Sequence, residues 1–287
     1  MNIIDILNLG FRLMKRERIG LSIDITDRCT LNCMTCYMKW YGKKDDLSLD
    51  RWIEIIENIP KEERIICAWT GGEPFLRIDD IKELTKFFKW NWIATNGTLP
   101  IERIPKTTIL ISVDGTKEVH NKIRGGWDDI VNNAIRDSYI AYNITKINSS
   151  KNILEETIEF WRDRVKGIIY SFYTPKKGEY KHSNLYQNTE EKMDVIGYIS
   201  DLKEIYGDFI VNTIEQLYYC VKIDWSQDCP ASKTMLALDA QGNVKKPCVL
   251  GENVDCKRCG CAVPTFMRFR PSIIKEGIRV LGGFANE

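Results

Sequence analysis

Hydrophobic and polar positions alternate along the chain in a way that predicts repeated strand and helix units. Short apolar runs rich in β-branched and aromatic residues predict six strands, at 20–26, 64–70, 91–95, 108–114, 139–147 and 167–174. Between them, apolar residues spaced three and four apart predict helices at 48–59, 79–90, 127–138 and 152–165. Ser48 is expected to cap the first of these helices. Strands that alternate with helices predict a parallel sheet built from βα units.

Six such units fit an open, partial barrel better than a closed barrel of eight. The expected fold is therefore α/β, a partial (β/α)6 barrel with a small C-terminal cysteine-rich appendage. Residues 20–207 would form the barrel, residues 1–19 a helix that caps it, and residues 208–287 the appendage and tail. In barrels of this type, functional residues lie at the C-terminal ends of the strands.

Turn residues and cysteines are found where the predicted strands end. Cys29 follows the first strand, "GGEP" (71–74) the second, "TNG" (95–97) ends the third, and "SVDG" (112–115) ends the fourth. Each Gly-containing pair is an ordinary turn signal by itself. Because the ends of parallel strands share one rim, their common position beside cysteines indicates a functional site there.

Composition and charge narrow the class of protein. A chain of 287 residues can bury a substantial core. Its 41 basic and 40 acidic residues nearly cancel, so the overall charge does not indicate a nucleic-acid partner. No apolar run reaches the roughly 18 residues of a membrane-spanning helix, and the N-terminus lacks a basic region ahead of its apolar residues. A cytoplasmic location is expected.

In a reducing compartment, ten cysteines favour metal binding over disulfides. They form a first group and a second group, which are Cys29, Cys33 and Cys36, then Cys229, Cys248, Cys256, Cys259 and Cys261. Cys67 and Cys220 stand apart and are expected to pack as small buried hydrophobic residues.

The first group has the number of ligands that suits an open iron-sulfur cluster. Three thiolates can bind three irons of a cubane 4Fe-4S cluster and leave the fourth iron open. An open metal position can take a chelating small molecule, as on a catalytic zinc. A zinc site is the alternative, but the only histidines, His120 and His182, are far along the chain from this group.

The C-x3-C-x2-C motif after the first strand, with "GGEP", "TNG" and "ISVDGTKEVHNKIRGG" (111–126) downstream, resembles the radical S-adenosylmethionine (radical SAM) enzymes. The likeness extends over about residues 20–175. It implies that Cys29, Cys33 and Cys36 hold a 4Fe-4S cluster whose fourth iron is chelated by the amino and carboxylate groups of S-adenosylmethionine. It also implies one-electron cleavage of that cofactor to methionine and a 5′-deoxyadenosyl radical, which abstracts hydrogen from a substrate.

The resemblance assigns the second loop to the methionine end of the cofactor. Gly71 and Gly72 would let the backbone approach the methionine moiety. Glu73 would supply a carboxylate for the ammonium group, and Pro74 would stiffen the loop.

Three further residues are assigned by the same resemblance. Ser112 would bond the cofactor's carboxylate or ribose, Arg124 would pair with the carboxylate, and Asn96 would line the adenosyl side. The sequence departs from the family pattern beside the third cysteine. The family usually has an aromatic residue before it, whereas here Thr35 precedes Cys36 and Tyr37 follows.

The second group resembles the twitch domain, a reduced form of the SPASM domain that carries an auxiliary iron-sulfur cluster. Five cysteines suffice for a second 4Fe-4S cluster with one to spare, and C-x2-C-x-C leaves open which of Cys256, Cys259 and Cys261 is not a ligand. A structural zinc ribbon is the alternative, since four thiolates and a hairpin suit zinc equally well.

The expected function is therefore radical modification of a substrate that is a peptide or another small molecule. A reductant protein such as ferredoxin or flavodoxin would supply the electron. A membrane lipid or apolar metabolite is an alternative substrate, because residues 1–18 combine spaced apolar residues with a basic cluster and could lie at a membrane surface as well as cap the barrel.

A noncatalytic iron-sulfur or zinc protein, serving electron transfer or binding, is the alternative of another class. The "GGEP" and "SVDG" segments argue against it, because an electron carrier has no need of an amine-and-carboxylate site beside its cluster.

Overall fold

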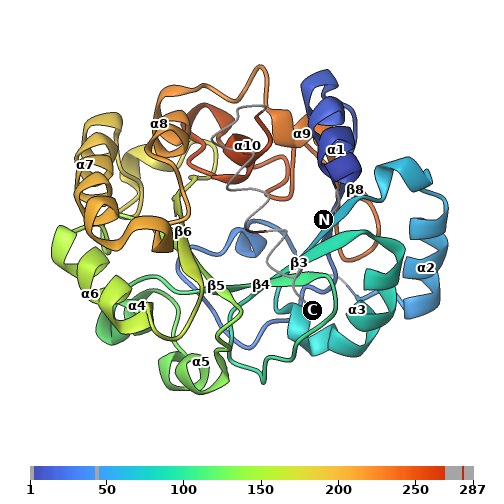
Figure 1. Cartoon of the computed structure of the whole chain (residues 1–287), viewed down its shortest axis with the longest axis horizontal. Helices are drawn as coiled ribbons and strands as arrows, with labels where there is room; N and C mark the ends of the chain where they lie inside the picture. The colour runs from blue at the N-terminus through green and yellow to red at the C-terminus, as the bar shows by residue number, and fades with distance from the viewer. Residues whose placement is uncertain (1–2, 43–44, 269–279, 281–287) are drawn as a thin grey trace.

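The computed structural model describes residues 3–42, 45–268 and 280. In this part of the chain one sheet of eight strands runs in the order β6-β5-β4-β3-β2-β1-β7-β8 (Figure 1). The strands are β1 (Gly20–Asp24), β2 (Ile66–Thr70), β3 (Trp90–Thr95), β4 (Thr107–Ser112), β5 (Tyr139–Ile144), β6 (Gly167–Phe172), β7 (Met235–Leu238) and β8 (Val244–Lys245). Most of the expected C-terminal tail, residues 269–279 and 281–287, lies outside the described residues.

Figure 1 shows helices α2 to α7 arranged around the outside of the curved sheet. The α-helices are α1 (Ile3–Lys15), α2 (Leu49–Glu57), α3 (Ile78–Leu84), α4 (Lys117–Ile123), α5 (Trp127–Asn133), α6 (Lys151–Trp161), α7 (Thr189–Tyr206), α8 (Ile214–Lys222), α9 (Pro230–Thr234) and α10 (Val263–Phe266). The outward-facing side chains of the strands, such as Ile93 and Ile109, pack against these helices and form the main core. The inward-facing side chains, such as Trp92 and Leu110, line the interior of the barrel.

The predicted fold class is confirmed: the first six strands pair in parallel and in sequence order, as in a partial (β/α)6 barrel. All six were predicted within a few residues of their observed positions. The Ser48 cap is also confirmed, since its side chain accepts a hydrogen bond from Arg51 N. The long helix α7 was missed, although Asn188 and Glu191 form a capping box at its start.

The segment "DAQGNV" (239–244) contains the turn of an antiparallel hairpin formed by β7 and β8. The hairpin is not a separate layer, because β7 pairs in parallel with β1, from Gly20 opposite Met235 to Ile23 opposite Leu238. Cys229 of the second cysteine group precedes this hairpin and the other four cysteines follow it. The group therefore lies beside β1 and β7, whose Ser22, Met235 and Ala237 line the same cavity.

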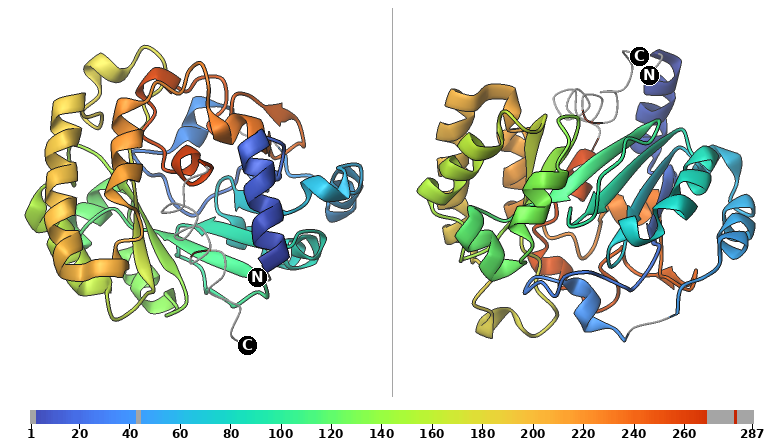
Figure 2. Two further views of the ribbon diagram at one scale, coloured as in Figure 1. Left: turned by 45° about the horizontal axis from the view of Figure 1, so that its top comes forward. Right: turned by 90° about the horizontal axis from the view of Figure 1, so that it is seen from below.

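Helix α1 lies at the end of the barrel opposite the loop that follows β1 (Figure 2, right). Its Leu9 and Leu13 pack with Ile19 and Met235, where β1 and β7 begin. Three large apolar side chains of the same helix are exposed: Leu7, Phe11 and Met14. No helix in the described ranges has the length and hydrophobicity needed to span a membrane.

Candidate functional site

The first cysteine group occupies the loop between β1 and a 3₁₀ helix at Tyr37–Trp40. Cys29 is exposed, Cys33 is buried and Cys36 is half-buried. Burial raises the pKa of Cys33, the positive charge of Arg124 opposes the rise, and Cys36 and Cys29 add to it. Cys29 and Cys36 are therefore close enough to affect the ionisation of Cys33, and a bound metal would remove the cost of that ionisation.

The loop after β2 is hydrogen-bonded to the cysteine loop. Gly72 N donates to Thr26 O at 2.7 Å, and Glu73 N donates to Arg28 O at 2.8 Å. A Cβ on Gly72 would lie 2.0 Å from Arg28 O, and Gly71 has a φ of +115°. Glycine is required at both positions because the cysteine-loop backbone occupies the space of a side chain.

Glu73 is fully buried, and its carboxylate is hydrogen-bonded within the protein. The carboxylate accepts hydrogen bonds from three donors: Phe75 N (2.9 Å), Thr95 Oγ1 (2.7 Å) and Asn96 N (2.7 Å). Burial raises the pKa of Glu73, and these donors oppose the rise. Its observed role is to join the loops after β2 and β3. Pro74 begins the 3₁₀ helix Pro74–Arg77 and is buried as well.

Asn96 lies against the first cysteine. Its Nδ2 is 3.5 Å from Cys29 Sγ and donates to Thr30 Oγ1 at 2.9 Å. Its Oδ1 accepts from Thr98 N at 2.9 Å. The amide nitrogen therefore contacts the cysteine loop while the amide oxygen fixes Asn96 within its own loop, an arrangement that the sequence did not predict.

Arg124 is held in place by the buried Asp114. Arg124 Nε donates to Asp114 Oδ2 at 2.5 Å, and Arg124 Nη1 lies 4.0 Å from Cys33 Sγ. The other oxygen of Asp114 accepts from Asn143 N at 2.8 Å. This arrangement leaves one side of the guanidinium beside the cysteines while the other side is fixed by a charge-assisted hydrogen bond.

His120 connects the two ends of the segment 114–125, which carries Arg124. Asp114 N donates to His120 Nδ1 at 3.1 Å, so the ring proton is on Nε2, which donates to Gly125 O at 3.0 Å. Burial lowers the pKa of His120 from 6.5 to about 4. The neutral ring therefore bridges the backbone of Asp114 and the backbone of Gly125, which follows Arg124.

A cavity of about 280 Å³ lies inside the barrel below this rim. Residues at or near the ends of the strands give it a polar side, with Thr70, Ser112, Asn143 and Ser171, and Arg124 lies beside them. Residues nearer the middle of the strands, with α10, give it apolar walls: Trp92, Leu110, Ala141, Ile169, Val263 and Phe266. The cavity can thus hold a ligand with a polar end beside Arg124 and an apolar part deeper in the barrel.

The structure brings all five cysteines of the second group to one cavity of about 130 Å³. Thr70, Trp92 and Val263 belong to the walls of both this cavity and the larger one. The two cavities are therefore neighbours inside the same barrel, and the sequence alone did not indicate this.

The second group consists of sulfur donors that bind protons tightly when no metal is present. Burial, with a smaller contribution from the neighbouring Cys229 and Cys256, raises the pKa of Cys248 to about 12 and that of Cys259 to about 11. Metal binding would replace those protons. Within the described residues no three Cys, His, Asp or Glu side chains approach as closely as the ligands of one metal ion.

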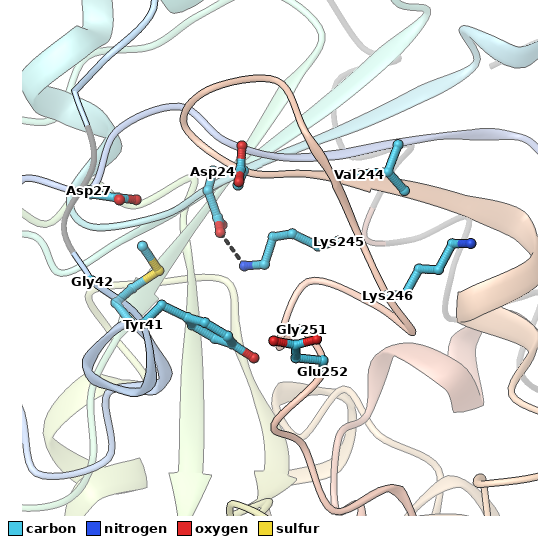
Figure 3. Close-up of a pocket in the computed structure, with 11 residues that line it drawn as sticks. Asp24, Asp27, Tyr41, Gly42, Val244, Lys245, Lys246, Gly251 and Glu252 are labelled. Atoms are coloured by element: carbon cyan, nitrogen blue, oxygen red, sulfur yellow. Dashed lines mark hydrogen bonds and ion pairs between the residues drawn. The ribbon is translucent and has the colours of Figure 1, made fainter.

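An open pocket of about 360 Å³ is lined by the end of β1, the segment around Tyr41, the β7–β8 hairpin and the loop at Gly251 and Glu252 (Figure 3). At its floor Lys245 forms an ion pair with the buried Asp24, which also accepts from Tyr37 OH at 2.8 Å. Tyr41 OH donates to Leu250 O at 2.9 Å. These contacts tie β1 and the first cysteine loop to the hairpin and loop around Cys248. None of them was predicted, because each joins residues far apart in sequence.

Comparison with known proteins agrees with this geometry. Residues 23–160 match the model of the Radical SAM superfamily. An uncharacterized protein of Methanocaldococcus jannaschii is 29% identical over 248 residues, which cover 71% of this chain and 85% of that protein. The sporulation killing factor maturation protein SkfB of Bacillus subtilis is 27% identical over 120 residues, 37% of this chain and 29% of SkfB.

The fold is similar to that of SuiB from Streptococcus suis. A structure of SuiB bound to the precursor peptide SuiA matches with a TM-score of 0.64 and 14% identity, over 96% of this chain and 70% of SuiB. A structure of SuiB bound to S-adenosylmethionine matches with a TM-score of 0.63 and 16% identity, over 94% of this chain and 70% of SuiB.

Proposed function

The chain belongs to the radical SAM superfamily, whose members are enzymes that use a 4Fe-4S cluster and S-adenosylmethionine, and we propose that this enzyme modifies a peptide in the cytoplasm. The observation that carries the proposal is the position of Cys33 and Arg124 at the rim of the barrel cavity. The peptide is supported by SuiB, which matches over nearly the whole chain and was solved with a precursor peptide, and by the maturation protein SkfB.

Cys29, Cys33 and Cys36 would hold the cluster. When bound, the cluster and S-adenosylmethionine supply reductive cleavage to a 5′-deoxyadenosyl radical that removes a hydrogen atom from the substrate, with the electron delivered by a reductant protein such as ferredoxin or flavodoxin. Arg124, fixed by Asp114, would bind the cofactor's carboxylate. Ser112 lines the polar side of the cavity and would bind the carboxylate or ribose.

Gly71 and Gly72 place the backbone of the second loop against the cysteine loop, where it can approach the methionine moiety. Glu73 and Pro74 would act indirectly, by holding that loop rigid. Asn96 would orient Cys29 and line the adenosyl side. The apolar walls around Trp92 and Phe266 would receive the substrate group that loses hydrogen and exclude water from it.

A second 4Fe-4S cluster would be held by four of Cys229, Cys248, Cys256, Cys259 and Cys261. Support for it comes from the convergence of these five side chains on one enclosed cavity beside the cavity proposed for the substrate. Zinc is the alternative at this position. Iron analysis decides between them, since the intact protein should hold about eight irons per chain and the Cys29→Ala/Cys33→Ala/Cys36→Ala variant about four.

A second candidate substrate is a membrane lipid or apolar metabolite, favoured by the exposed side chains Leu7, Phe11 and Met14 on α1. Lys15 lies over the Phe11 ring at 4.3 Å and adds a positive charge beside this apolar face. The test is sedimentation with vesicles of anionic lipid. Replacing the three exposed residues by serine should abolish binding if the helix contacts membranes. This candidate would be rejected if the serine variant sediments as the unmodified protein does, or if the unmodified protein does not sediment with the vesicles.

The first experiment is anaerobic incubation of the reconstituted, dithionite-reduced protein with S-adenosylmethionine, followed by chromatography of 5′-deoxyadenosine. The product should form with the unmodified protein and be lost in Cys33→Ala. Cys67→Ala is a matched control, because Cys67 is a fully buried cysteine within β2, away from both groups. Deuterium transfer from labelled peptides to 5′-deoxyadenosine then tests the peptide. Absence of 5′-deoxyadenosine from a fully loaded protein with peptides present would contradict the proposal.

A further inference from the structure

Lys192, in the first turn of α7, is a buried lysine, with 4% of its surface exposed. In the described part of the chain no carboxylate pairs with its ammonium group. Its Nζ lies instead over two aromatic rings, at 4.9 Å from the centroid of Tyr186 and 5.6 Å from that of Phe172. A buried cation without an anionic partner is costly, and ring faces offset only about 2 kcal/mol of that cost.

Two cysteines, Cys220 and Cys259, are near enough to Lys192 to affect its ionisation. Burial lowers the pKa of Lys192 to about 8, and these two groups oppose the decrease. Other lysines of the protein pair with carboxylates on the surface, such as Lys151 with Asp201 at 2.8 Å. Lys192 therefore differs from them in facing the second cysteine group instead of an acid.

The packing around Lys192 leads directly to that group. Phe172 N donates to Gly260 O at 2.8 Å, and a Cβ on Gly260 would lie 2.5 Å from Phe172 Cβ. The residue under the Lys192 ammonium is thus in contact with the Cys259–Cys261 segment. Cys220 Sγ lies 3.6 Å from Cys261 O, on the neighbouring helix α8.

We propose that Lys192 is the counter-charge of the metal centre held by the second cysteine group, and that its ammonium group raises the reduction potential of that centre. The inference rests on the proposed function, because it requires an iron-sulfur cluster at that group. One-electron reduction adds one negative charge there and neither forms nor breaks a bond. A positive charge in a medium of low dielectric stabilises the added electron, as charge and burial are known to set the potentials of such clusters.

The test is a redox titration followed by electron paramagnetic resonance in the full-length Cys29→Ala/Cys33→Ala/Cys36→Ala background, where only the second cluster remains. Lys192→Met removes the charge and keeps the length of the side chain, and it should shift the midpoint potential to a more negative value. Lys192→Arg keeps the charge and should leave the potential close to that of the background protein. Lys192→Gln is a second neutral variant, with the same expected shift, should the methionine variant bind iron poorly.

Lys222→Met is the matched control, since Lys222 on α8 is exposed and lies over the Tyr218 ring at 4.9 Å. Its removal should leave the potential unchanged. Equal potentials in the background protein and in an iron-loaded neutral variant at Lys192 would overturn the inference, and so would an equal shift in Lys192→Arg, which would indicate packing and not charge. A background protein without iron would overturn the second cluster itself, and this inference with it.

Discussion

The Arg124 guanidinium lies between a thiol and a carboxylate, with Nη1 at 4.0 Å from Cys33 Sγ and Nε at 2.5 Å from Asp114 Oδ2. Asp114 is fully buried, and both of its oxygens are used. An arginine held from one side only by a rigid carboxylate keeps its remaining N–H donors in a fixed direction. Asp114 and Arg124 therefore provide a cation of fixed position beside Cys33, the buried cysteine of the motif.

Asp114→Asn should weaken binding of S-adenosylmethionine about tenfold or more, because it removes a charge-assisted bond of about 1.5 to 3 kcal/mol that fixes Arg124. Equilibrium binding to the reconstituted protein measures the change. Iron content should stay the same, since Asp114 holds no metal. The matched control is Asp128→Asn, whose partner Lys117 forms an exposed ion pair at 2.6 Å. Equal affinity in Asp114→Asn and the control would show that the position of Arg124 does not matter.

Glu73→Gln tests the revised role of this residue. The amide keeps one acceptor oxygen but places an NH₂ group against one of the donors that the carboxylate accepts, such as Asn96 N at 2.7 Å. A loss of about 2 to 3 kcal/mol in the free energy of unfolding is expected for disrupting this buried network. Thermal unfolding without S-adenosylmethionine measures it. An unchanged unfolding temperature combined with weak cofactor binding would instead favour direct contact between Glu73 and the ammonium group.

The barrel could be predicted from the sequence because its strands are short buried runs bounded by turn residues. The rim followed from topology, since parallel strands bring segments such as 71–74 and 112–115 to one edge. Cysteine spacing indicated the proposed first metal site, because three candidate ligands within one loop need no long-range information.

Orientation and long-range contacts could not be predicted. The motif identified Glu73 as an acid but not its direction, which is set by donors on β3 and the loop after it. The ion pair of Asp24 with Lys245 joins residues 221 positions apart, and no local pattern marks either of them. The sequence did not single out Lys192, because residues 176–207 carry no motif. The helix that contains it could have been predicted from the spacing of its apolar residues.

Tyr41→Phe should loosen the connection between the two cysteine groups. It removes a hydroxyl that donates to Leu250 O and accepts from Asn253 N at 3.0 Å, next to Cys248. The free energy of unfolding should decrease by about 1 to 3 kcal/mol, because both backbone groups lose a hydrogen-bond partner. The predicted consequence is faster release of iron from the second group to a chelator, measured in the background that lacks the first group.

Tyr198→Phe is the control for this measurement, since Tyr198 is 37% exposed on α7. Equal rates of iron release in the two variants would mean that the Tyr41 hydroxyl does not hold the Cys248 loop. Lys245→Met offers an independent test of the same connection, because it leaves the buried Asp24 without its cation, and it should accelerate release further.

His120 should make the protein less stable in mild acid. Its folded-state pKa is about 4 against an ordinary value of 6.5, so only the unfolded chain takes up this proton between those values. The free energy of unfolding should therefore fall as pH decreases from about 6.5 to 4, by on the order of 3 kcal/mol in total. A proton on Nδ1 would also displace the bond from Asp114 N and put a second cation beside Arg124.

The measurement is the anaerobic unfolding temperature at pH 7 and pH 5 for the unmodified protein and for His120→Gln. The variant should be less stable at pH 7, because it loses the two bonds made by the ring, but its unfolding temperature should depend less on pH. Carboxylate titration affects both proteins equally and cancels in the difference. If both lose the same number of degrees between pH 7 and pH 5, the neutral His120 is not the source of the acid sensitivity.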